Sequence, residues 1–383
     1  MERLDYTEDF ALDPAHVWLN VASEGPLPRC AAAALQQAVE WKSAVHLLTI
    51  PKFQTVPLEL KKSIARLINA DKDDVILGNS ATYGIHLLAN GIKFRKADEI
   101  ILLQNDFPTD ILPWLSLEQR GVVVRQLNAR DHVLTVEEIK AAVSDRTRLI
   151  CLPLVHSFTG FKHDIAGISR FCRSRNILCV VNLSQAAGAL DIDLRQWEAD
   201  AAVCAGYKWL LGPYGTGFCW INQNLRQQLD YPQNYWVSLM DEAGLNSEGP
   251  LTLKDDHSAR RYDVFGTANF FNFVPWKASI EYLLSIGLAA LEKHDQGLAD
   301  RIVDGLDREF FDLISPFPKQ ARTNIVVFSC KEPAKNKDLF DFLNHEGFHL
   351  ALWKNKLRAS PHIYNTSEQI EKFLNTLERY ASK

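Results

Sequence analysis

The chain has 383 residues, of which 47% are hydrophobic and 23% charged, and its formal net charge is −5. This composition is typical of globular proteins, and the length allows about two to three domains with large cores. The acidic balance gives no electrostatic reason to expect a nucleic-acid partner. The N-terminus lacks the order of a signal peptide, and no apolar run approaches the ~18 residues that a membrane span needs. We therefore expect a cytoplasmic protein with neither nucleic-acid nor membrane partners.

Between residues 75 and 221 the chain alternates short apolar runs with helical or loop stretches. Seven runs have the length and composition of strands: VILGN, EIILLQ, VVVRQL, RLICLPLV, ILCVVNLS, AAVCAG and GFCWI. The alternation predicts an α/β fold, with a mostly parallel seven-stranded sheet covered by helices. Thr135 and Glu138 have the spacing of a capping box and predict the start of one of these helices.

Beyond residue 273 the pattern changes to long helical stretches followed by a mixed segment. We expect helices over 274–287 and 288–311, a strand over 324–329, a helix over 337–347, strands over 349–355 and 357–364, and a last helix from Thr366. These elements predict a smaller α+β domain. The expected division is a large domain over residues 15–270 and a small domain formed by 1–14 and 271–383.

The seven cysteines are scattered along the chain, and several lie in the strand-like runs. None belongs to a CxxC pair, and they occupy positions 30, 151, 172, 179, 204, 219 and 330. An odd, dispersed set favours buried reduced thiols over a disulfide framework.

Residues 345–349, HEGFH, match the His-Glu-x-x-His pattern of zinc proteases. That pattern binds zinc because one helix presents both imidazoles on the same face. Gly347 stands where the preceding helix is expected to stop, so the two histidines should not share a helix. We therefore expect no metal site here.

Lys208 lies in an apolar and aromatic run, AGYKWLLGPYGTGFCW, at residues 205–220. The run does not fit a P-loop, whose lysine follows its glycines, or a dinucleotide fingerprint. A lysine that is partly desolvated in an apolar pocket has a lowered pKa and can form a Schiff base with a carbonyl group. A lysine taken alone is more often a surface residue, so the companions of Lys208 decide between the two interpretations.

A second strand-like run, VVNLSQAAGALDID, ends in polar groups 26 residues before Lys208. Successive parallel strands deliver such groups to the carboxyl edge of a sheet, where ligands bind. Both runs resemble segments of the pyridoxal-phosphate enzymes of the class V aminotransferase family. Five further segments are similar to that family in the same order: 18–28, 76–92, 105–114, 265–269 and 357–370. The resemblance implies a fold-type I enzyme of the branch that holds cysteine desulfurases and isopenicillin N epimerase.

The resemblance also implies a cofactor site for pyridoxal 5'-phosphate. The expected contacts are Ser80, Ala81, Thr82, Phe107, His156, Asn182, Gln185, Tyr207, Lys208, Gly266 and Thr267. A helix that begins near Ser80 would bind the phosphate, the Phe107 ring would stack on the cofactor, and Gln185 would bond its phenolic oxygen. From the residues alone, Phe107 could equally be a core aromatic and His156 a satisfied histidine at a strand end.

Arg358 matches the residue that binds the substrate carboxylate, with Asn20 and Ser23 as its neighbours. A planar guanidinium binds a carboxylate in bidentate fashion, which indicates an amino-acid substrate. Gly266 and Thr267 match a phosphate contact that comes from a second subunit. The resemblance therefore implies a homodimer with shared active sites, and such dimers are common.

Two departures from the family pattern bear on the reaction. No cysteine lies between residues 331 and 358, where the desulfurases carry their nucleophile, so desulfuration through a persulfide is not expected. Position 182 holds asparagine where the family has aspartate, whose charge keeps a proton on the pyridine nitrogen. Asparagine can bond that nitrogen but cannot balance its positive charge.

We expect an enzyme that acts on an α-amino acid through an internal aldimine at Lys208, with transamination as the leading reaction. The amine of Lys208, once displaced by the substrate, would also act as general base and acid for the Cα proton. A C–S β-lyase or an amino-acid epimerase of the same family is the alternative, because all three reactions share Cα deprotonation. Asn182 keeps open an interpretation from another class, a protein that binds the cofactor without turnover.

Overall fold

The computed structural model describes residues 5–129, 133–231, 233–236, 240, 244, 246–251, 258–266 and 269–382. Its main feature is a seven-stranded sheet with the order β2-β8-β7-β6-β5-β3-β4. The four pairs from β7 to β4 are parallel, whereas β8 runs antiparallel to β7 and β2. The strands are β2 (Val75–Gly78), β3 (Glu99–Leu103), β4 (Val123–Leu127), β5 (Thr147–Pro153), β6 (Leu178–Asn182), β7 (Ala201–Ala205) and β8 (Gly217–Ile221). All seven expected strands are present, which confirms the mostly parallel sheet.

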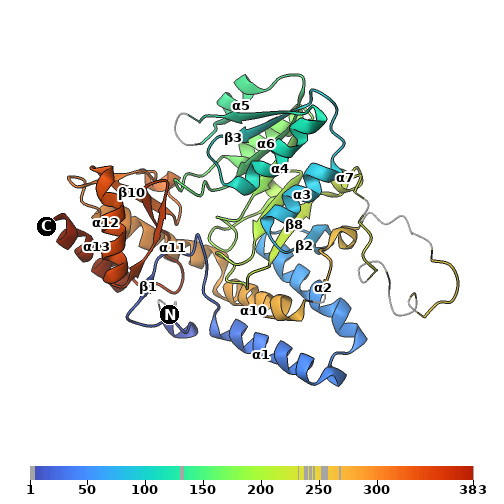
Figure 1. Ribbon diagram of the computed structural model, residues 1–383, viewed down its shortest axis with the longest axis horizontal. Coiled ribbons are helices and arrows are strands. Elements are labelled where there is room, and N and C mark those ends of the chain that lie inside the picture. The colour runs from blue at the N-terminus through green and yellow to red at the C-terminus, as the bar shows by residue number, and fades with distance from the viewer. Residues whose placement is uncertain are drawn as a thin grey trace.

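Helices cover both faces of this sheet (Figure 1). One hydrophobic cluster joins α3 and α4 to alternate strand residues such as Ile100 and Val203. A second cluster joins α2, α6 and α10 to the opposite face through residues such as Ile101 and Ala202. The helices are α1 (Arg29–Ser43), α2 (Ile50–Leu67), α3 (Ala81–Gly91), α4 (Leu112–Leu115), α5 (Val136–Ala142), α6 (Ile165–Ser174), α7 (Gln223–Arg226) and α10 (Phe270–Ile286). The expected capping box at Thr135 is present at the start of α5.

The C-terminal part forms a separate layer with its own core, coloured orange to red in Figure 1. A four-stranded antiparallel sheet has the order β12-β13-β10-β9, and β1 pairs in parallel with β11. The elements are β1 (Val17–Trp18), α11 (Leu288–Gly305), β9 (Phe311–Leu313), β10 (Val326–Cys330), α12 (Asn336–His345), β11 (Phe348–His349), β12 (Ala351–Trp353), β13 (Lys356–Ala359) and α13 (Ser367–Ala381). The antiparallel sheet with its helices confirms the expected smaller α+β part.

The expected helix over 288–311 was wrong at its C-terminal end. Helix α11 ends at Gly305, and Phe311 begins β9, where it pairs with Cys330 and is 1% exposed. Glycine is a poor helix former, and burial of an aromatic residue against a neighbouring strand outweighs helical propensity.

The division of the chain at residue 270 stays a prediction. Helix α10 packs into the core under the large sheet through Phe273 and Trp276, and Gly287 separates it from α11. Val17 and Leu19 pack instead with the C-terminal core. We propose that the boundary lies near Gly287.

Three smaller expectations concern cysteines, the HEGFH segment and membrane spans. Six cysteines are buried and only Cys30 is exposed, so the expectation of buried thiols was wrong for Cys30 alone. Helix α12 ends at His345, and Gly347 has φ of 85°, so one helix does not carry both histidines. Among the described residues, no helix is long and apolar enough to cross a membrane.

Candidate active site

A pocket opens at the carboxyl ends of β5, β6 and β7, beside the N-terminus of α3. Because parallel strands end at the same edge, residues from separate loops meet there. Eight of the residues expected to bind the cofactor line this pocket: Ser80, Ala81, Thr82, Phe107, Asn182, Gln185, Tyr207 and Lys208. The structure therefore brings most of the predicted set together.

Lys208 follows β7 and presents its amine to the pocket while its side chain is largely buried, with 7% of the residue exposed. Burial, and after it the positive charge of Arg358, lower the pKa of Lys208 to about 8. Within the described part of the chain, no carboxylate forms an ion pair with this amine. The Nζ atom lies 5.0 Å from the centroid of the Phe107 ring. The amine is therefore much easier to deprotonate than that of an exposed lysine.

The N-terminus of α3 forms one wall of the pocket. Ser80 caps the helix, since its Oγ accepts a hydrogen bond of 3.2 Å from the backbone N–H of Tyr83. The hydroxyl groups of Thr82 and Thr109 are 3.0 Å apart. Unpaired backbone N–H groups and the positive end of the helix dipole favour an anion such as a phosphate.

Gln185 lines the pocket with an amide that is already engaged. Its Nε2 donates to the carbonyl oxygen of Ala22 at 3.0 Å and to Ser157 Oγ at 3.3 Å. Its Oε1 accepts from Trp209 Nε1 at 2.8 Å. A bond to a ligand's phenolic oxygen would therefore replace the longer bond to Ser157.

Asp110 is the main site residue that the sequence analysis missed. It lies at the end of a short 3₁₀ helix (Pro108–Asp110), is 2% exposed and lines the pocket. Asn182 Nδ2 donates to its two carboxylate oxygens at 2.7 and 3.0 Å. Burial raises the pKa of Asp110, and the hydrogen bond from Asn182 opposes the rise. Position 110 belongs to the segment expected to stack on the cofactor, but no local pattern indicates a partner at position 182.

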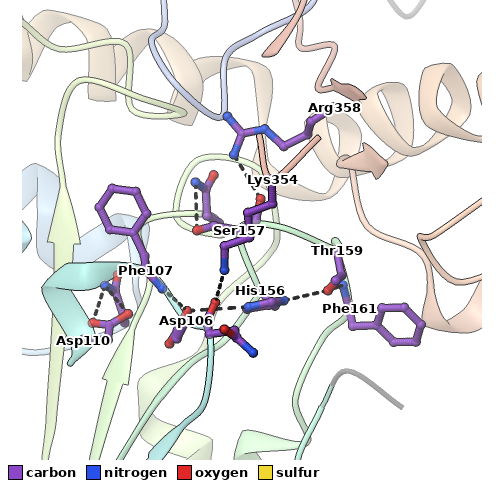
Figure 2. A network of polar contacts seen from close by, with 12 residues as sticks. Asp106, Phe107, Asp110, His156, Ser157, Thr159, Phe161, Lys354 and Arg358 are labelled. Atoms are coloured by element: carbon purple, nitrogen blue, oxygen red, sulfur yellow. Dashed lines mark hydrogen bonds and ion pairs between the residues drawn. The ribbon is translucent and has the colours of Figure 1, made fainter. Parts of the chain in front are cut away.

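Arg358 reaches the site from β13 of the C-terminal part (Figure 2). Its guanidinium donates to the carbonyl oxygen of Ser157 at 3.0 Å, to Ser23 Oγ at 2.7 Å and to Asn20 Oδ1 at 3.4 Å. The residue is 3% exposed and has no carboxylate partner within the described residues. A buried guanidinium held by neutral groups is ready to bind an anionic ligand.

Three expected residues are not part of the pocket lining. His156 is buried behind it, with Nδ1 2.8 Å from Thr159 Oγ1 and Nε2 4.0 Å from Asp106 Oδ1. Gly266 lies on the surface with φ of 78°. Thr267 lies outside the described residues.

Comparisons with known proteins agree with this geometry. The family model "Aminotransferase class-V" matches residues 18–373. A protein named "Probable cysteine desulfurase" from Methanothermobacter thermautotrophicus is 27% identical, over 100% of this chain and 98% of its own. Isopenicillin N epimerase from Streptomyces clavuligerus is also 27% identical, over 96% of this chain and 95% of its own.

Solved structures share the whole fold. A mutant of C-DES with glycine covalently linked to its pyridoxal-phosphate cofactor superposes with a TM-score of 0.88 and 19% identity, covering 97% of this chain and 98% of that one. The apo cysteine desulfurase from Thermococcus onnurineus gives a TM-score of 0.86 with 21% identity, over 97% and 96% of the two chains. The chain belongs to the class V aminotransferase family of pyridoxal-phosphate enzymes. This confirms the expected family, fold and cofactor.

Proposed function

We propose that the protein acts on an α-amino acid with pyridoxal phosphate as cofactor, and that transamination is its reaction. One observation carries the proposal: the buried amine of Lys208 and the buried guanidinium of Arg358 belong to the same site, and neither has a carboxylate partner among the described residues. The amine suits an aldehyde, and the guanidinium suits the carboxylate of an amino acid.

The described residues fit the cofactor. The N-terminus of α3 would hold the phosphate, Phe107 would cover one face of the ring, and Lys208 would join the aldehyde carbon. When bound, the cofactor supplies an aldehyde for Schiff-base formation and a ring that withdraws electrons from Cα.

The remaining work is done by side chains of this protein. Arg358, supported by Ser23 and Asn20, would hold the substrate carboxylate and orient Cα. Lys208 Nζ, once free as a neutral amine, would accept the Cα proton and return it. The lowered pKa of Lys208 increases the fraction of amine that can act as this base.

A persulfide mechanism is disfavoured by the positions of the cysteines. The segment 331–358 contains none. Cys204 is buried in β7, and burial raises the pKa of its thiol. A buried thiol of raised pKa is a poor nucleophile. The relatives that are named cysteine desulfurases therefore do not fix the reaction of this chain.

Two other reactions of the family are the alternatives to transamination. C-DES, named a cystine C–S lyase, shares the fold with a TM-score of 0.85, and isopenicillin N epimerase is a relative at 27% identity. Both a β-lyase and an epimerase would use the same Cα deprotonation by Lys208. Because Asn182 cannot balance a positive charge on the pyridine nitrogen, a protein that binds the cofactor without turnover is a further possible outcome of the test.

The test is a product analysis on the purified, cofactor-loaded protein with single amino acids. A keto acid formed together with the amino form of the cofactor supports transamination. Pyruvate with a thiol identifies a β-lyase, and an inverted amino acid identifies an epimerase; either result overturns transamination. No product from any amino acid identifies a non-catalytic binder. Lys208→Ala should abolish the reaction, while Lys162→Ala, at an exposed position, should leave it unchanged.

We further propose that the protein is a homodimer. Phe265 is 65% exposed and Tyr214 is 62% exposed, large aromatic surfaces of the kind that interfaces bury. A Cβ atom added to Gly266, beside Phe265, would meet no atom of the described chain within 4 Å, so the backbone there is open to a neighbour. Sedimentation velocity should give twice the mass of one chain, and Phe265→Glu should shift it to the mass of one; a monomeric wild type would overturn the proposal.

A further inference from the structure

Asn182 holds a buried carboxylate at the floor of the pocket. Its Oδ1 accepts the backbone N–H of Ser184 at 2.9 Å, which fixes the plane and orientation of the amide. Its Nδ2 then donates to both oxygens of Asp110, at 2.7 and 3.0 Å. The asparagine is therefore used as a positioning group for Asp110, and Figure 2 shows Asp110 beside Phe107 in the same loop.

The carboxyl group of Asp110 forms no direct ion pair with a cationic side chain of the described residues. It is 2% exposed, and no lysine or arginine nitrogen of the described chain lies within 4.0 Å of it. The positive charge of Lys208 lowers the pKa of Asp110, but from beyond the distance of an ion pair. A buried carboxylate is costly unless it is paired, so the pocket itself favours a cationic group placed against Asp110.

A second carboxyl group, that of Asp106, lies next to Asp110 and affects its ionisation. Burial, and then the charge of Asp110, raise the pKa of Asp106 well above its usual range. The same interaction lowers the pKa of Asp110 relative to burial alone. Two close carboxyls titrate as a pair, so a cationic group placed against Asp110 would favour the state in which Asp110 is ionised and Asp106 keeps the proton. His156 faces Asp106 from behind the pocket, at 4.0 Å.

We propose that Asp110, held by Asn182, is the carboxylate that faces the ring nitrogen of the cofactor and keeps that nitrogen protonated. This inference rests on the proposed function, because it concerns the cofactor of the same site. Position 110 would then carry the aspartate that the family has at position 182, and Asn182 would hold that aspartate in place. The positive charge of the ring nitrogen would supply the cation that the buried carboxylate lacks.

The test measures the protonation state of the nitrogen directly. Wild type is loaded with pyridoxal phosphate carrying ¹⁵N in the ring, and the ¹⁵N chemical shift is read at pH 7.5. We expect the shift of a protonated pyridine in wild type and that of a neutral pyridine in Asp110→Asn. The double variant Asp110→Asn/Asn182→Asp exchanges the two side chains and should restore the protonated shift, because the carboxylate returns to the pair.

The matched control is Asp145→Asn, which removes a fully exposed aspartate and should leave the ¹⁵N shift unchanged. The dissociation constant of the cofactor should rise about tenfold in Asp110→Asn, since a charge-assisted hydrogen bond is lost, and not in Asp145→Asn. Asn182→Leu, which removes the support and keeps Asp110, should give an intermediate rise.

A neutral ring nitrogen in wild type would overturn the inference without any variant, as would a protonated nitrogen in Asp110→Asn. Should Asp110→Asn fail to fold, a neutral nitrogen in wild type would still overturn the inference, as would an unchanged dissociation constant of the cofactor in Asn182→Leu. A protein that takes up no cofactor at all would instead overturn the proposed function, so the two failures are distinguishable.

Discussion

The guanidinium of Arg358 and the amine of Lys208 are buried in one site, and the charge of the first acts on the second. Burial has the larger effect, the charge of Arg358 has the next, and together they lower the pKa of Lys208 to about 8. The arginine that would bind the substrate thus also lowers the pKa of the lysine that would bind the cofactor. The negative charge of a substrate carboxylate would weaken this effect once the substrate is bound.

The first prediction is that Lys208 reacts with aldehydes at lower pH than an exposed lysine does. Only the neutral amine attacks a carbonyl, so the rate should rise with pH and level off above about 8, where the pKa of Lys208 lies. Arg358→Gln removes a like charge, raises the pKa of Lys208 and should move the midpoint to higher pH. The measurement is the initial rate of Schiff-base formation between cofactor-free protein and pyridoxal at each pH.

Arg301→Gln is the control for this experiment, because Arg301 is half exposed and pairs with Glu371. Its midpoint should equal that of wild type. A wild-type midpoint near the ordinary lysine value of about 10.4 would contradict the prediction, as would a lower midpoint in Arg358→Gln.

The second prediction concerns binding of the substrate carboxylate. Arg358→Lys keeps the charge but loses the planar fork, and we expect kcat/KM for the best amino acid to fall by about 10- to 100-fold. Ser23→Ala removes an acceptor that lies 2.7 Å from the guanidinium and should raise KM about three- to tenfold with little change in kcat. Amines without a carboxylate should respond to neither substitution. Equal losses for amines and amino acids would exclude Arg358 as the carboxylate site.

Much of the fold follows from local patterns in the sequence. The seven strand-like runs coincide with the strands of the large sheet because each is apolar, short and bounded by polar residues. Ser80 and Thr135 mark helix starts because their side chains accept backbone N–H bonds in isolation from the rest of the fold. Strand β9 was missed because its assignment depends on pairing with β10, which no local pattern records.

The site was predicted less completely for a related reason. Lys208 and Arg358 follow from recognisable segments. In the structure Lys208 lines the pocket, and Arg358 donates a hydrogen bond to Ser157, another residue of the lining. In the sequence by itself, Asn182 indicates that the site has lost the negative charge of the family's aspartate. The carboxyl group that Asn182 holds, that of Asp110, is 72 positions away in the chain, so the sequence does not reveal it. Only the three-dimensional contact with Asp110 shows that a carboxyl group still lines the pocket next to position 182.

The third prediction concerns stability and a buried ion pair. Lys61 Nζ lies 2.8 Å from Asp263 Oδ1, with both side chains 5% exposed. Asp263→Asn would leave the buried ammonium unpaired and should lower the free energy of unfolding by about 3–5 kcal/mol in urea titrations. The exposed pair of Lys62 and Glu59 is the control, since Glu59→Gln should cost less than about 1 kcal/mol. Equal effects of the two substitutions would contradict this account of the buried pair.

The fourth prediction concerns the contact between the N-terminal loop and the lysine segment. Gly25 donates its N–H to the carbonyl oxygen of Tyr207 at 2.9 Å, and a Cβ atom there would lie 2.2 Å from the carbonyl oxygen of Lys208. Gly25→Ala should therefore displace the loop, weaken cofactor binding and cost about 1–3 kcal/mol of stability.

Gly297→Ala is the matched control, because Gly297 lies within α11 and the added carbon would meet no described atom within 4 Å outside its own helix backbone. It should stabilise the protein by up to about 1 kcal/mol and leave cofactor affinity unchanged. Thermal unfolding and cofactor titration measure both effects. If Gly25→Ala kept the stability and the cofactor affinity of wild type, the close contact between Gly25 and the backbone of Lys208 would not be needed.

The central claim is that Lys208 forms the covalent bond to the cofactor. Cofactor-loaded protein is reduced with borohydride, digested, and analysed by mass spectrometry for lysines that carry the reduced cofactor. We predict a single modified lysine, Lys208, and no modification in Lys208→Ala treated in the same way. Modification of another lysine, or unmodified Lys208 in protein that retains the cofactor, would contradict the claim.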